Sequence, residues 1–332
     1  MMRNLTLATA VSAIALAAVP ASAQTELTYL TDWFAQAEHG GMYQAVATGL
    51  YEKYGLDVSI QMGGPQMNIQ QLLAAGAVDM GTGSNSFFPL NIQQAGGDSV
   101  AVMAMFQKDP QILMTHPRDD ISSIADMVGN PIMLSNDSVS TFWVWLSTQY
   151  GFTEDMIRPY TFQMAPWLVD DSAIQQGYLS SEPFLVEQEG IIPEVYLIAD
   201  TGYPAYSSHA LVPASLIESD PEIVQGFVDA TIEGWVSYLF GDREAADALI
   251  MTDNPEMTPD KIAYGVEKML EFGILTSGDA ETMGIGAMTH ERWETFFTIM
   301  ADAGIYAADM DYQAAYTLDF INQGMGLDMM PQ

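Results

Sequence analysis

The sequence predicts an α/β protein with two lobes, each built on a mainly parallel sheet with flanking helices. Short apolar strands alternate with helical segments along the first part of the chain, which is typical of βαβ units and parallel sheets. A polar break at 108–110 interrupts this series, and a second αβ series follows it. The 332 residues also suit two domains better than one, at about 150 residues per domain.

The first series of elements is expected between residues 27 and 106. Gly55 and Gly76 close its first two helices, because glycine readily adopts the left-handed conformation in which helices end. Its last helix has to accommodate Pro89. The expected strands span 27–30, 56–61, 78–81 and 100–106, and the expected helices span 38–54, 67–75 and 84–95.

The second series is expected between residues 112 and 199, and a mostly helical segment follows residue 220. Two of the later helices begin with a capping residue followed by proline, at Asp220-Pro221 and Thr258-Pro259. The expected strands span 112–115, 132–134, 157–162 and 195–199, the helices 124–128 and 140–150, and a short helix-and-strand unit 173–179. The later helices are expected at 221–240, 242–251, 259–272 and 289–303.

The two series predict two lobes joined by two crossings of the chain. Residues 24–108 and 210–332 are expected to form lobe 1, and residues 109–209 to form lobe 2. The crossings are expected near 107–115 and 203–212. Two crossings make a hinge, and the cleft between hinged lobes is the natural place for a ligand.

The composition excludes several classes of function. With 9 Lys and Arg against 43 Asp and Glu, the formal net charge is -34, which repels nucleic acids and anionic membrane surfaces. The hydrophobic fraction of 49% excludes a disordered chain. The absence of cysteine from the sequence excludes disulfides, zinc-thiolate sites and cysteine nucleophiles.

The N-terminus has the pattern of a signal peptide at residues 1–23. Arg3 supplies the positive start, residues 5–19 form an apolar run, and Ala-Ser-Ala at 21–23 is a small-residue cleavage site. The alternative is a membrane anchor, but the run is shorter than the about 20 residues that span a bilayer. We therefore expect cleavage before Gln24 and a location outside the cytoplasm, in the periplasm where the cell has two membranes.

No motif indicates catalysis or a bound cofactor. The sequence lacks the nucleophile elbow G-x-S-x-G, the zinc motif H-E-x-x-H, a Walker loop and a dinucleotide-binding glycine pattern after a strand. Its 4 histidines are scattered without the spacing of metal ligands. We therefore expect a binding protein with no catalytic residues, no metal and no cofactor.

A candidate ligand-binding region follows the first expected strand. Ligands of open α/β sheets bind at the carboxyl ends of strands, and this strand ends at Asp32 and Trp33. Trp33 can stack on a planar ligand while Asp32 or His39 bonds its polar edge. Tyr43 lies four residues after His39 and therefore shares its helical face. The alternative is that Trp33 and Tyr43 fill the core and that Asp32 caps a turn.

Polar residues follow two other expected strands. Ser84 and Asn85 come after the third strand of the first series, and Ser135 and Asn136 after the second strand of the second series. At a helix start, such residues contact ligands through their side chains and through free backbone N–H groups. The alternative, ordinary N-capping, is compatible with ligand contact.

The second series contributes a carboxylate and aromatic surface. Glu182 lies directly before Pro183 and can act as a bidentate acceptor for ligand N–H groups, or else as a solvated surface acid. Trp167 and Tyr206 add aromatic side chains near the expected hinge. Aromatic lining of a cleft suits a planar ring or a quaternary ammonium group.

Several segments together resemble one protein family. They are D-W-F at 32–34, E-H-G-G-M-Y at 38–43, the glycine-containing run 49–58, L-L-A-A-G-A-V-D at 72–79 and S-E-P-F at 181–184. These segments resemble substrate-binding proteins of ABC importers in the nitrate/sulfonate/taurine and thiamine-pyrimidine-precursor group. The resemblance implies a type II periplasmic-binding-protein fold that closes on a small molecule and delivers it to an ABC permease in the inner membrane. We expect a monomer.

The resemblance also implies roles for individual residues. The D-W-x-x-x-x-x-H pattern is most similar to the branch that holds a pyrimidine ring. By this resemblance Trp33 stacks on the ring, His39 and Tyr43 line the first lobe, and Glu182 meets the ring amine. The expected ligand is a neutral or cationic nitrogen heterocycle such as a thiamine pyrimidine precursor.

Alternatives to this function stay open. A receptor for sulfonate or taurine would have the same fold and would be favoured by an arginine in the cleft, and a quaternary-amine receptor would be favoured by an aromatic cage. A sensor partner of a chemoreceptor would also have this fold. An enzyme similar to the pyrimidine-precursor synthase is disfavoured, because the cysteine-rich motif of that enzyme is absent from the sequence.

Overall fold

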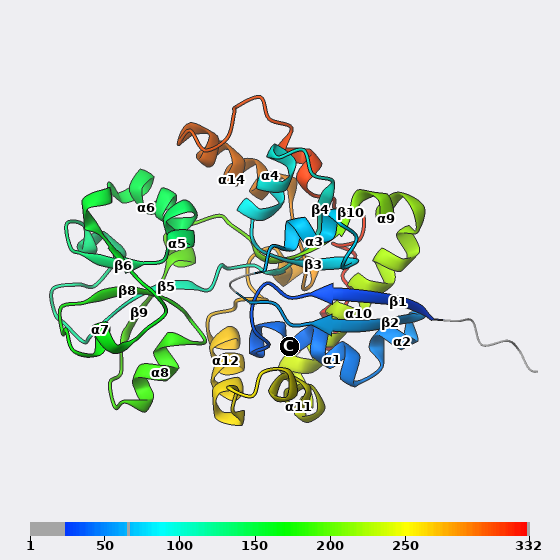
Figure 1. The fold of residues 1–332 in the computed structure, drawn as a ribbon, viewed down its shortest axis with the longest axis horizontal. Helices are drawn as coiled ribbons and strands as arrows, with labels where there is room; N and C mark the ends of the chain where they lie inside the picture. Colours follow the sequence, from blue (N-terminus) through cyan, green and yellow to red (C-terminus); the bar gives the residue numbers. More distant parts are fainter. Residues whose placement is uncertain (1–23, 65–66, 331–332) are drawn as a thin grey trace, which may run out of the picture.

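The described chain folds into two lobes, each built on a five-stranded sheet with helices packed around it (Figure 1). The computed structural model describes residues 24–64 and 67–330, so the expected signal peptide lies outside the described residues. The two-lobe α/β fold expected from the sequence is confirmed. In the part of the chain that the structure describes, no helix combines the length and apolar character needed to cross a membrane.

Lobe 1 contains the strands β1 (Thr25–Leu30), β2 (Leu56–Gln61), β3 (Met80–Asn85), β4 (Ser99–Phe106) and β10 (Ser207–Pro213). Their order in the sheet is β2-β1-β3-β10-β4. β1 pairs in parallel with β2, with Thr25 opposite Leu56 and Leu30 opposite Gln61. β3 is parallel to β1, whereas β10 runs antiparallel to β3 and β4.

Lobe 2 contains the strands β5 (Gln111–Thr115), β6 (Ile132–Leu134), β7 (Ile157–Pro159), β8 (Ile174–Tyr178) and β9 (Glu194–Leu197). Their order in the sheet is β7-β6-β8-β5-β9. β6 is parallel to both β7 and β8, and β5 is antiparallel to β8 and β9.

Both sheets are mixed, and the positions of the antiparallel strands follow from the chain path. β5 and β10 are the first strands after the two crossings, which occupy residues 107–110 and 202–206. The parallel strands of each lobe end at the cleft. A chain that arrives from the other lobe starts its strand at the cleft and runs away from it, so β5 and β10 are antiparallel to their neighbours.

The helices of lobe 1 cover both sides of its sheet, and a long C-terminal segment supplies most of them. They are α1 (Gly40–Ala47), α2 (Leu50–Lys53), α3 (Ile69–Ala74), α4 (Phe87–Gln94), α9 (Ala214–Ser219), α10 (Pro221–Phe240), α11 (Glu244–Asp253), α12 (Pro259–Glu271), α13 (Ala280–Met283) and α14 (His290–Asp302). Short 3-10 turns complete the lobe at η1 (Ala37–His39), η5 (Tyr312–Ala315) and η6 (Leu327–Met329).

Two glycines allow α1 and α10 to approach closely. A Cβ atom on Gly41 would lie 2.2 Å from the ring of Trp235, and one on Gly234 would lie 2.2 Å from the carbonyl oxygen of Gly41. Any side chain at either position would therefore separate the helices. This packing fixes α1, and with it the η1 turn that precedes it at the cleft.

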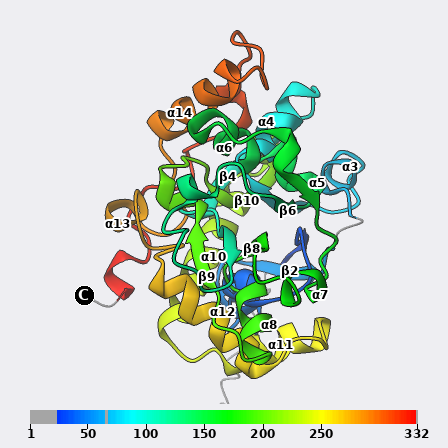
Figure 2. The ribbon, with the colours of Figure 1, turned by 90° about the vertical axis from the view of Figure 1, so that its left-hand side faces the viewer.

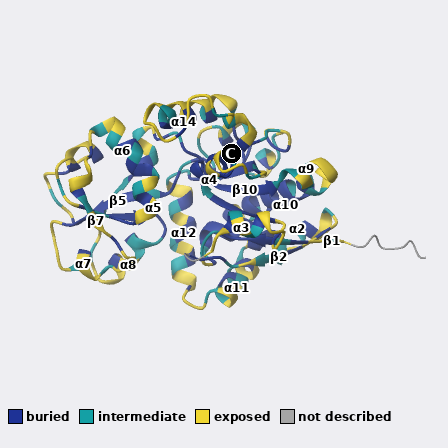
Figure 3. Cartoon of the chain, turned by 45° about the horizontal axis from the view of Figure 1, so that its top comes forward, coloured by how far each residue is buried: buried dark blue, intermediate teal, exposed yellow. Residues whose placement is uncertain are grey.

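The helices of lobe 2 are shorter and surround a smaller core. They are α5 (Asn136–Ser140), α6 (Phe142–Tyr150), α7 (Ala165–Leu168) and α8 (Glu182–Gln188), with 3-10 turns η2 (Ile124–Met127), η3 (Glu154–Met156) and η4 (Ile198–Thr201). The inner strands of both lobes are mostly buried, the edge strand β7 is exposed, and the outer faces of the helices are exposed (Figure 3).

Arg292 of α14 fastens the two crossings to lobe 1. Its guanidinium donates hydrogen bonds to the carbonyl oxygens of Pro204 at 2.8 Å and Ala205 at 3.0 Å, in the second crossing. It also donates to the carbonyl oxygen of Gln107, in the first crossing. The guanidinium carbon lies 3.9 Å from the ring centroid of Tyr206, which gives a cation–π contact. One side chain of lobe 1 therefore contacts both crossings of the hinge.

Some local expectations differ from the structure. The helix expected at 84–95 begins at Phe87, because β3 continues through Asn85. The helix expected at 140–150 is divided at Thr141, whose backbone φ and ψ of -120° and -105° are not helical. The strand expected at 157–162 ends at Pro159, and residues 207–212, expected to be part of a crossing, belong to β10, which lies between β3 and β4 in the sheet.

Candidate functional site: the interlobe cleft

The cleft is bounded by loops that follow parallel strands of both lobes. The loops after β1 and β3 of lobe 1 face the loops after β6 and β8 of lobe 2. Along one edge, α4 lies near α5 and α6, and along the opposite edge α12 lies near α8 (Figures 1 and 2). Side chains far apart in the sequence therefore meet in one place.

Aromatic side chains from both lobes meet in the cleft. Trp33, in the loop after β1, lies 5.7 Å from Phe162 of lobe 2 between ring centroids, with the ring planes tilted by 45°. Phe34 packs edge-on against Trp33 at 5.6 Å, and Tyr160 lies 5.2 Å from Phe162. Trp33 is half-buried and Phe162 is 52% exposed, so both rings keep surface that a flat ligand can cover.

Glu182 is held beside these rings by two hydrogen bonds. Its Oε1 accepts the hydroxyl hydrogen of Tyr160 at 3.0 Å, and its Oε2 accepts the backbone N–H of Tyr178 at 2.7 Å. Burial raises the pKa of the Glu182 carboxyl, and these hydrogen bonds act in the opposite direction. Each carboxylate oxygen has a further lone pair, so this fixed group can still accept an N–H from a ligand.

Asp32 and His39 form a pair on the lobe 1 side of the cleft. Asp32 Oδ1 lies 3.2 Å from His39 Nε2. His39 is 3% exposed, and among the described residues its Nδ1 has no hydrogen-bond partner. The side chain of Asp32 is 22% exposed, so Asp32 is the member of the pair that a ligand can reach, with His39 supporting it from within the lobe.

A buried hydrogen bond joins the lobes directly, in addition to the exposed one from Tyr264 of α12 to Glu187 of α8. Ser180, after β8, donates to Glu38 Oε1 of η1. Burial raises the pKa of Glu38 to about 7, so this carboxyl is partly protonated at neutral pH. Gly265 of α12 backs the contact, because a Cβ there would lie 2.9 Å from Ala37 and 3.4 Å from Ser180. The bond and the close packing hold the lobes together.

Carboxylates gather on both sides of the cleft. Burial raises the pKa of Asp137 at the start of α5, and the charge of Asp32 on the other lobe raises it further. Burial also raises the pKa of Asp109, in the first crossing, to about 7. The carboxyls of Asp32 and Asp137 repel each other across the cleft, so a further negative charge is disfavoured and a neutral or cationic ligand is favoured. Across the described residues, no three His, Asp or Glu side chains are arranged to hold a metal ion.

A cavity of about 350 Å³ opens between the lobes at the edge formed by α4, α5 and α6. Both lobes contribute to its walls, so its shape depends on how the lobes meet. The volume lies within the range of about 300 to 1,000 Å³ that small-molecule sites occupy. It is lined by Asn85, Phe87, Phe88, Asn91, Asp137, Val139, Ser140, Thr141, Val144 and Ile305.

Other sequence-predicted candidates lie at strand and helix ends that border the cleft. Ser84 is the penultimate residue of β3. Ser135 is the N-cap of α5, where its Oγ accepts the N–H of Ser138 at 3.2 Å. Asn136 is the exposed first residue of the same helix. Ser135 therefore caps a helix in the manner that the sequence offered as an alternative.

Three sequence-predicted candidates present almost no surface to a ligand. Tyr43 is 2% exposed, and its hydroxyl donates to Asp253 at 2.7 Å. Trp167 is 0% exposed and stacks on His116 at 3.7 Å between ring centroids. Tyr206 is 1% exposed and lies under Arg292 at the hinge. Because these side chains fill cores or fasten the hinge, they do not enter the site proposed below.

Four residues of the cleft were not singled out from the sequence. Tyr160 and Phe162 lie directly after β7, where the rule of strand ends could have found them. Asp137 follows a predicted pair, and its role becomes visible only from its position opposite Asp32. Asn91 lies within α4 and has no local signal, because only the packing of the two lobes brings it to a cavity.

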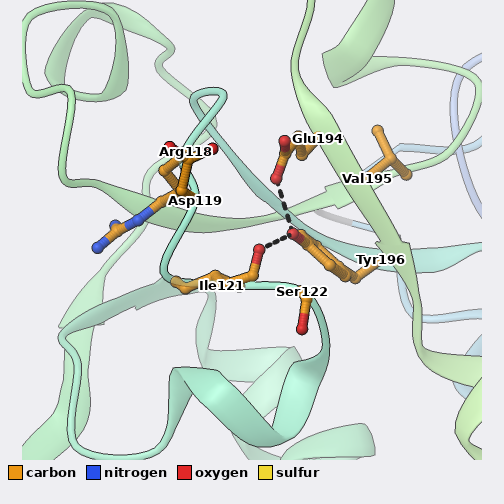
Figure 4. Close-up of a pocket in the computed structure, with 7 residues that line it drawn as sticks. All are labelled: Arg118, Asp119, Ile121, Ser122, Glu194, Val195 and Tyr196. Carbon is orange, nitrogen blue, oxygen red and sulfur yellow. Dashed lines mark hydrogen bonds between the residues drawn. The ribbon is translucent and has the colours of Figure 1, made fainter.

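A second hollow, of about 520 Å³, lies at the ends of β5 and β9 that point away from the cleft (Figure 4). The hydroxyl of Tyr196 lies 2.9 Å from the carbonyl oxygen of Ile121 and 2.8 Å from Glu194 Oε2. Arg118 donates to both carboxylate oxygens of Asp120 at 2.7 Å. The polar groups of this hollow are therefore engaged with one another, and we place the site in the interlobe cleft.

Known structures share this fold. The periplasmic aliphatic sulphonate binding protein SsuA from Escherichia coli superposes with a TM-score of 0.67 at 16% identity, covering 87% of this chain and 91% of that chain. The desulfurization enzyme DSZB superposes with a TM-score of 0.61 at 14% identity, covering 92% and 100%. The fold by itself therefore occurs both in binding proteins and in an enzyme.

Fold, cleft and relatives define a two-lobe solute-binding protein of the type that serves ABC importers. The chain belongs to the NMT1/THI5-like family, whose model matches residues 36–246, and the family resemblance expected from the sequence is confirmed. It is 25% identical to the riboflavin-binding protein RibY of Chloroflexus aurantiacus, over 90% of this chain and 87% of that protein. It is 23% identical to the formylaminopyrimidine-binding protein of Halalkalibacterium halodurans, over 80% and 81%.

Proposed function

We propose that the protein is the extracytoplasmic receptor of an ABC importer and that it closes on a small, neutral or cationic nitrogen heterocycle, such as a thiamine pyrimidine precursor. One observation carries this proposal: Trp33 and Phe162 face each other from opposite lobes, beside the fixed carboxylate of Glu182. The two relatives support it, because riboflavin and formylaminopyrimidine are both flat nitrogen heterocycles.

Binding requires Phe162 to move. A ring sandwiched between two aromatic faces needs about 7 Å between them, twice the contact distance of about 3.5 Å between carbon atoms. Trp33 and Phe162 are 5.7 Å apart and tilted. Phe162 is 52% exposed, so little packing opposes the movement of its ring away from Trp33. The ligand ring then lies on Trp33 and donates an N–H to Glu182.

Closure of the lobes couples binding to transport. The bond from Ser180 to Glu38 forms only when the lobes meet, so a ligand that touches both lobes shifts the population toward the closed form. The closed form is the one that an ABC permease in the inner membrane would recognise. On this proposal residues 1–23 are cleaved as a signal peptide, and the receptor acts in the periplasm as a monomer. Lobe 1, residues 24–108 and 210–332, moves against lobe 2, residues 109–209.

The charge of the cleft separates this proposal from a sulfonate or taurine receptor. An anion in the cleft would meet the carboxylates of Asp32, Asp137 and Glu182. Arg292 is bound to backbone carbonyls at the hinge, and Arg158, two residues before Tyr160, is exposed and bound to backbone carbonyls of its own turn. A quaternary amine is the second candidate ligand, because Trp33 and Phe162 with the nearby carboxylates also suit a positive charge. We propose no chemical step in the cleft.

The test is a calorimetric titration with a hydroxymethyl aminopyrimidine, riboflavin, taurine and choline. We expect at least one heterocycle to bind and taurine not to bind. Trp33→Ala should weaken binding by about tenfold or more through the loss of stacking, whereas Phe240→Ala, a change of an exposed aromatic on α10, should not. Glu182→Gln should weaken the binding of a ligand that carries a ring amine by about tenfold, and Glu222→Gln, a change of an exposed glutamate, is its control.

Two results would contradict the proposal. Binding of taurine alone would keep the receptor and reject the heterocycle. Heterocycle binding that is unchanged in both Trp33→Ala and Glu182→Gln would reject the aromatic site. Choline binding that depends on Trp33 and Phe162 would select the second candidate.

A further inference from the structure

The interlobe cavity offers hydrogen-bond donors from lobe 1. Asn85 is 6% exposed, and its Oδ1 accepts the N–H of Phe87 at 3.1 Å. Asn91 Oδ1 accepts the hydroxyl hydrogen of Tyr306 at 2.9 Å. Both amides are thus oriented through their oxygens, and neither NH₂ group has a hydrogen bond to another described residue. Two fixed NH₂ groups, each with two N–H donors, are therefore left for a ligand.

The same cavity offers acceptors from lobe 2. The hydroxyls of Ser140 and Thr141 donate to the carbonyl oxygen of Asp137 at 2.9 Å and 3.0 Å, which leaves their oxygen lone pairs free. The carboxylate of Asp137 accepts no hydrogen bond from a described residue. Val139 and Val144 add apolar surface between these groups. Donors on one wall thus face acceptors on the other.

This pairing of walls selects an uncharged, hydroxylated group. A hydroxyl both donates and accepts, so a row of hydroxyls can satisfy both walls at once. An anionic group would be repelled by Asp137, and an ammonium group would leave the amide donors of Asn85 and Asn91 without acceptors. A cavity of about 350 Å³ also exceeds the about 30 Å³ that one water occupies, so it can hold a chain of several atoms.

The cavity lies beside the aromatic part of the cleft. β1 and β3 are neighbours in the sheet, with Leu30 opposite Gly81, so the loop after β1 that holds Asp32 lies next to the end of β3, where Asn85 lines the cavity. Asp137, on the other wall of the cavity, interacts with the charge of Asp32. Asp32 directly precedes Trp33, the ring on which the ligand is proposed to stack. A ligand that holds its ring at Trp33 can therefore extend a side chain past Asp32 into the cavity.

We infer that the ligand is a heterocycle bearing a flexible, uncharged polyhydroxylated chain, and that the cavity between α4 and α5–α6 is the compartment for that chain. This inference rests on the proposed function and narrows it. A compact aminopyrimidine would leave the amides of Asn85 and Asn91 facing water, whereas a ring with a sugar-alcohol chain would satisfy both walls.

The test compares two flavins that share one ring. Riboflavin carries a ribityl chain, and lumiflavin carries a methyl group in its place, so the difference in their dissociation constants measures the chain alone. Titration of the purified protein, followed by quenching of flavin fluorescence, gives both constants. We expect riboflavin to bind at least about tenfold more tightly than lumiflavin, the effect of one or more well-made hydrogen bonds.

Variants of the cavity locate the effect. Asn91→Leu and Asp137→Ala should each raise the dissociation constant of riboflavin by about tenfold and leave that of lumiflavin unchanged. Gln94→Leu, on the exposed side of the same helix α4, and Asp57→Ala, exposed on β2, are matched controls that should change neither constant. The melting temperatures of the variants check that they fold, and the two variants lie on different lobes, so one misfolded variant does not remove the test.

Each outcome separates this inference from the proposed function. Equal affinities for riboflavin and lumiflavin would overturn the assignment of the cavity as the compartment for the chain. Equal losses of affinity for both flavins in the cavity variants would do so too. Either result would leave the proposal of heterocycle binding intact. Binding of a hydroxymethyl aminopyrimidine without binding of either flavin would also overturn the assignment and leave that proposal intact. Failure of every heterocycle to bind would overturn both proposals together.

Discussion

Replacing Arg292 with methionine removes the side chain that fastens both crossings of the hinge. Methionine keeps a long apolar stem that can lie over Tyr206 but cannot donate hydrogen bonds. The carbonyl oxygens of Gln107, Pro204 and Ala205 would each lose a charged donor. The change therefore tests whether one residue holds the hinge in place.

The size of the effect follows from these contacts. A hydrogen bond to a charged group contributes about 1.5 to 3 kcal/mol, and Arg292 donates to three carbonyl oxygens. Two effects make the net loss of stability smaller than the sum of the three hydrogen bonds. Burial lowers the pKa of Arg292, which shows that desolvation of its charge offsets part of their contribution. The side chain of Arg292 is also 20% exposed, so water can reach the carbonyl oxygens that the substitution leaves without a donor. We expect a loss of roughly 3 to 5 kcal/mol in the free energy of unfolding.

Urea unfolding followed by circular dichroism measures this loss. Arg158→Met is the matched control, because Arg158 is exposed and bonds only the carbonyl oxygens of Asp155 and Ile157 in its own turn, each at 2.8 Å. The control should lose less than about 0.5 kcal/mol. A loss below about 1 kcal/mol in Arg292→Met would mean that the hinge is held by packing and that the hydrogen bonds are replaced by water.

Two further predictions concern the contact between the lobes. The pKa of Glu38, raised to about 7 from 4.5, lies above its unfolded value, so the folded state binds the proton more tightly and stability falls as the pH rises through this range. Glu38→Gln should remove the part of the fall in melting temperature that Glu38 causes between about pH 5 and about pH 8. His209, whose pKa burial lowers to about 3, makes stability rise with pH, and it does so equally in both proteins. An unchanged slope of melting temperature against pH in Glu38→Gln would refute the role of Glu38. Gly265→Val should hold the lobes apart, because its Cβ alone would lie 3.4 Å from Ser180 of lobe 2 and its two methyl groups would need space beyond that contact. Small-angle scattering should then report a larger radius of gyration and titration at least about tenfold weaker ligand binding, whereas unchanged scattering would show that α12 can move aside.

The sequence predicted most of the fold because its local signals agree with the tertiary structure. The strands 56–61 and 132–134 and the helix 221–240 have the expected limits, since apolar runs, Gly55 and Asp220-Pro221 mark their ends. The strand β10 was missed because it begins with Ser207, Ser208 and His209. These polar residues are buried by pairing with β3 and β4, and that pairing has no local signal.

The candidate site could be predicted only in part. Trp33 and Glu182 were found because each follows a strand in its own lobe. Phe162 was missed as a cleft residue because the strand expected at 157–162 included it, whereas β7 ends at Pro159 and leaves Phe162 in the loop that meets Trp33. Trp167 was selected for its residue type, yet it fills the core of lobe 2, because burial depends on packing by distant segments.

Ligand charge is the property that the chain restricts most strongly. The sequence holds only 9 Lys and Arg, and in the described part most of them face a carboxylate or a backbone carbonyl, as Lys53 does with Glu233 at 2.7 Å and Lys268 with Glu271 at 2.7 Å. The positive charge of Lys261 acts on the cleft carboxyls Glu38 and Glu182. It lowers their pKa by less than burial raises it. An anionic ligand would thus lose its hydration among carboxylates whose charge Lys261 offsets only in part. A neutral ring with N–H and hydroxyl groups meets no such penalty, and a protonated ring gains from the same field that repels the anion.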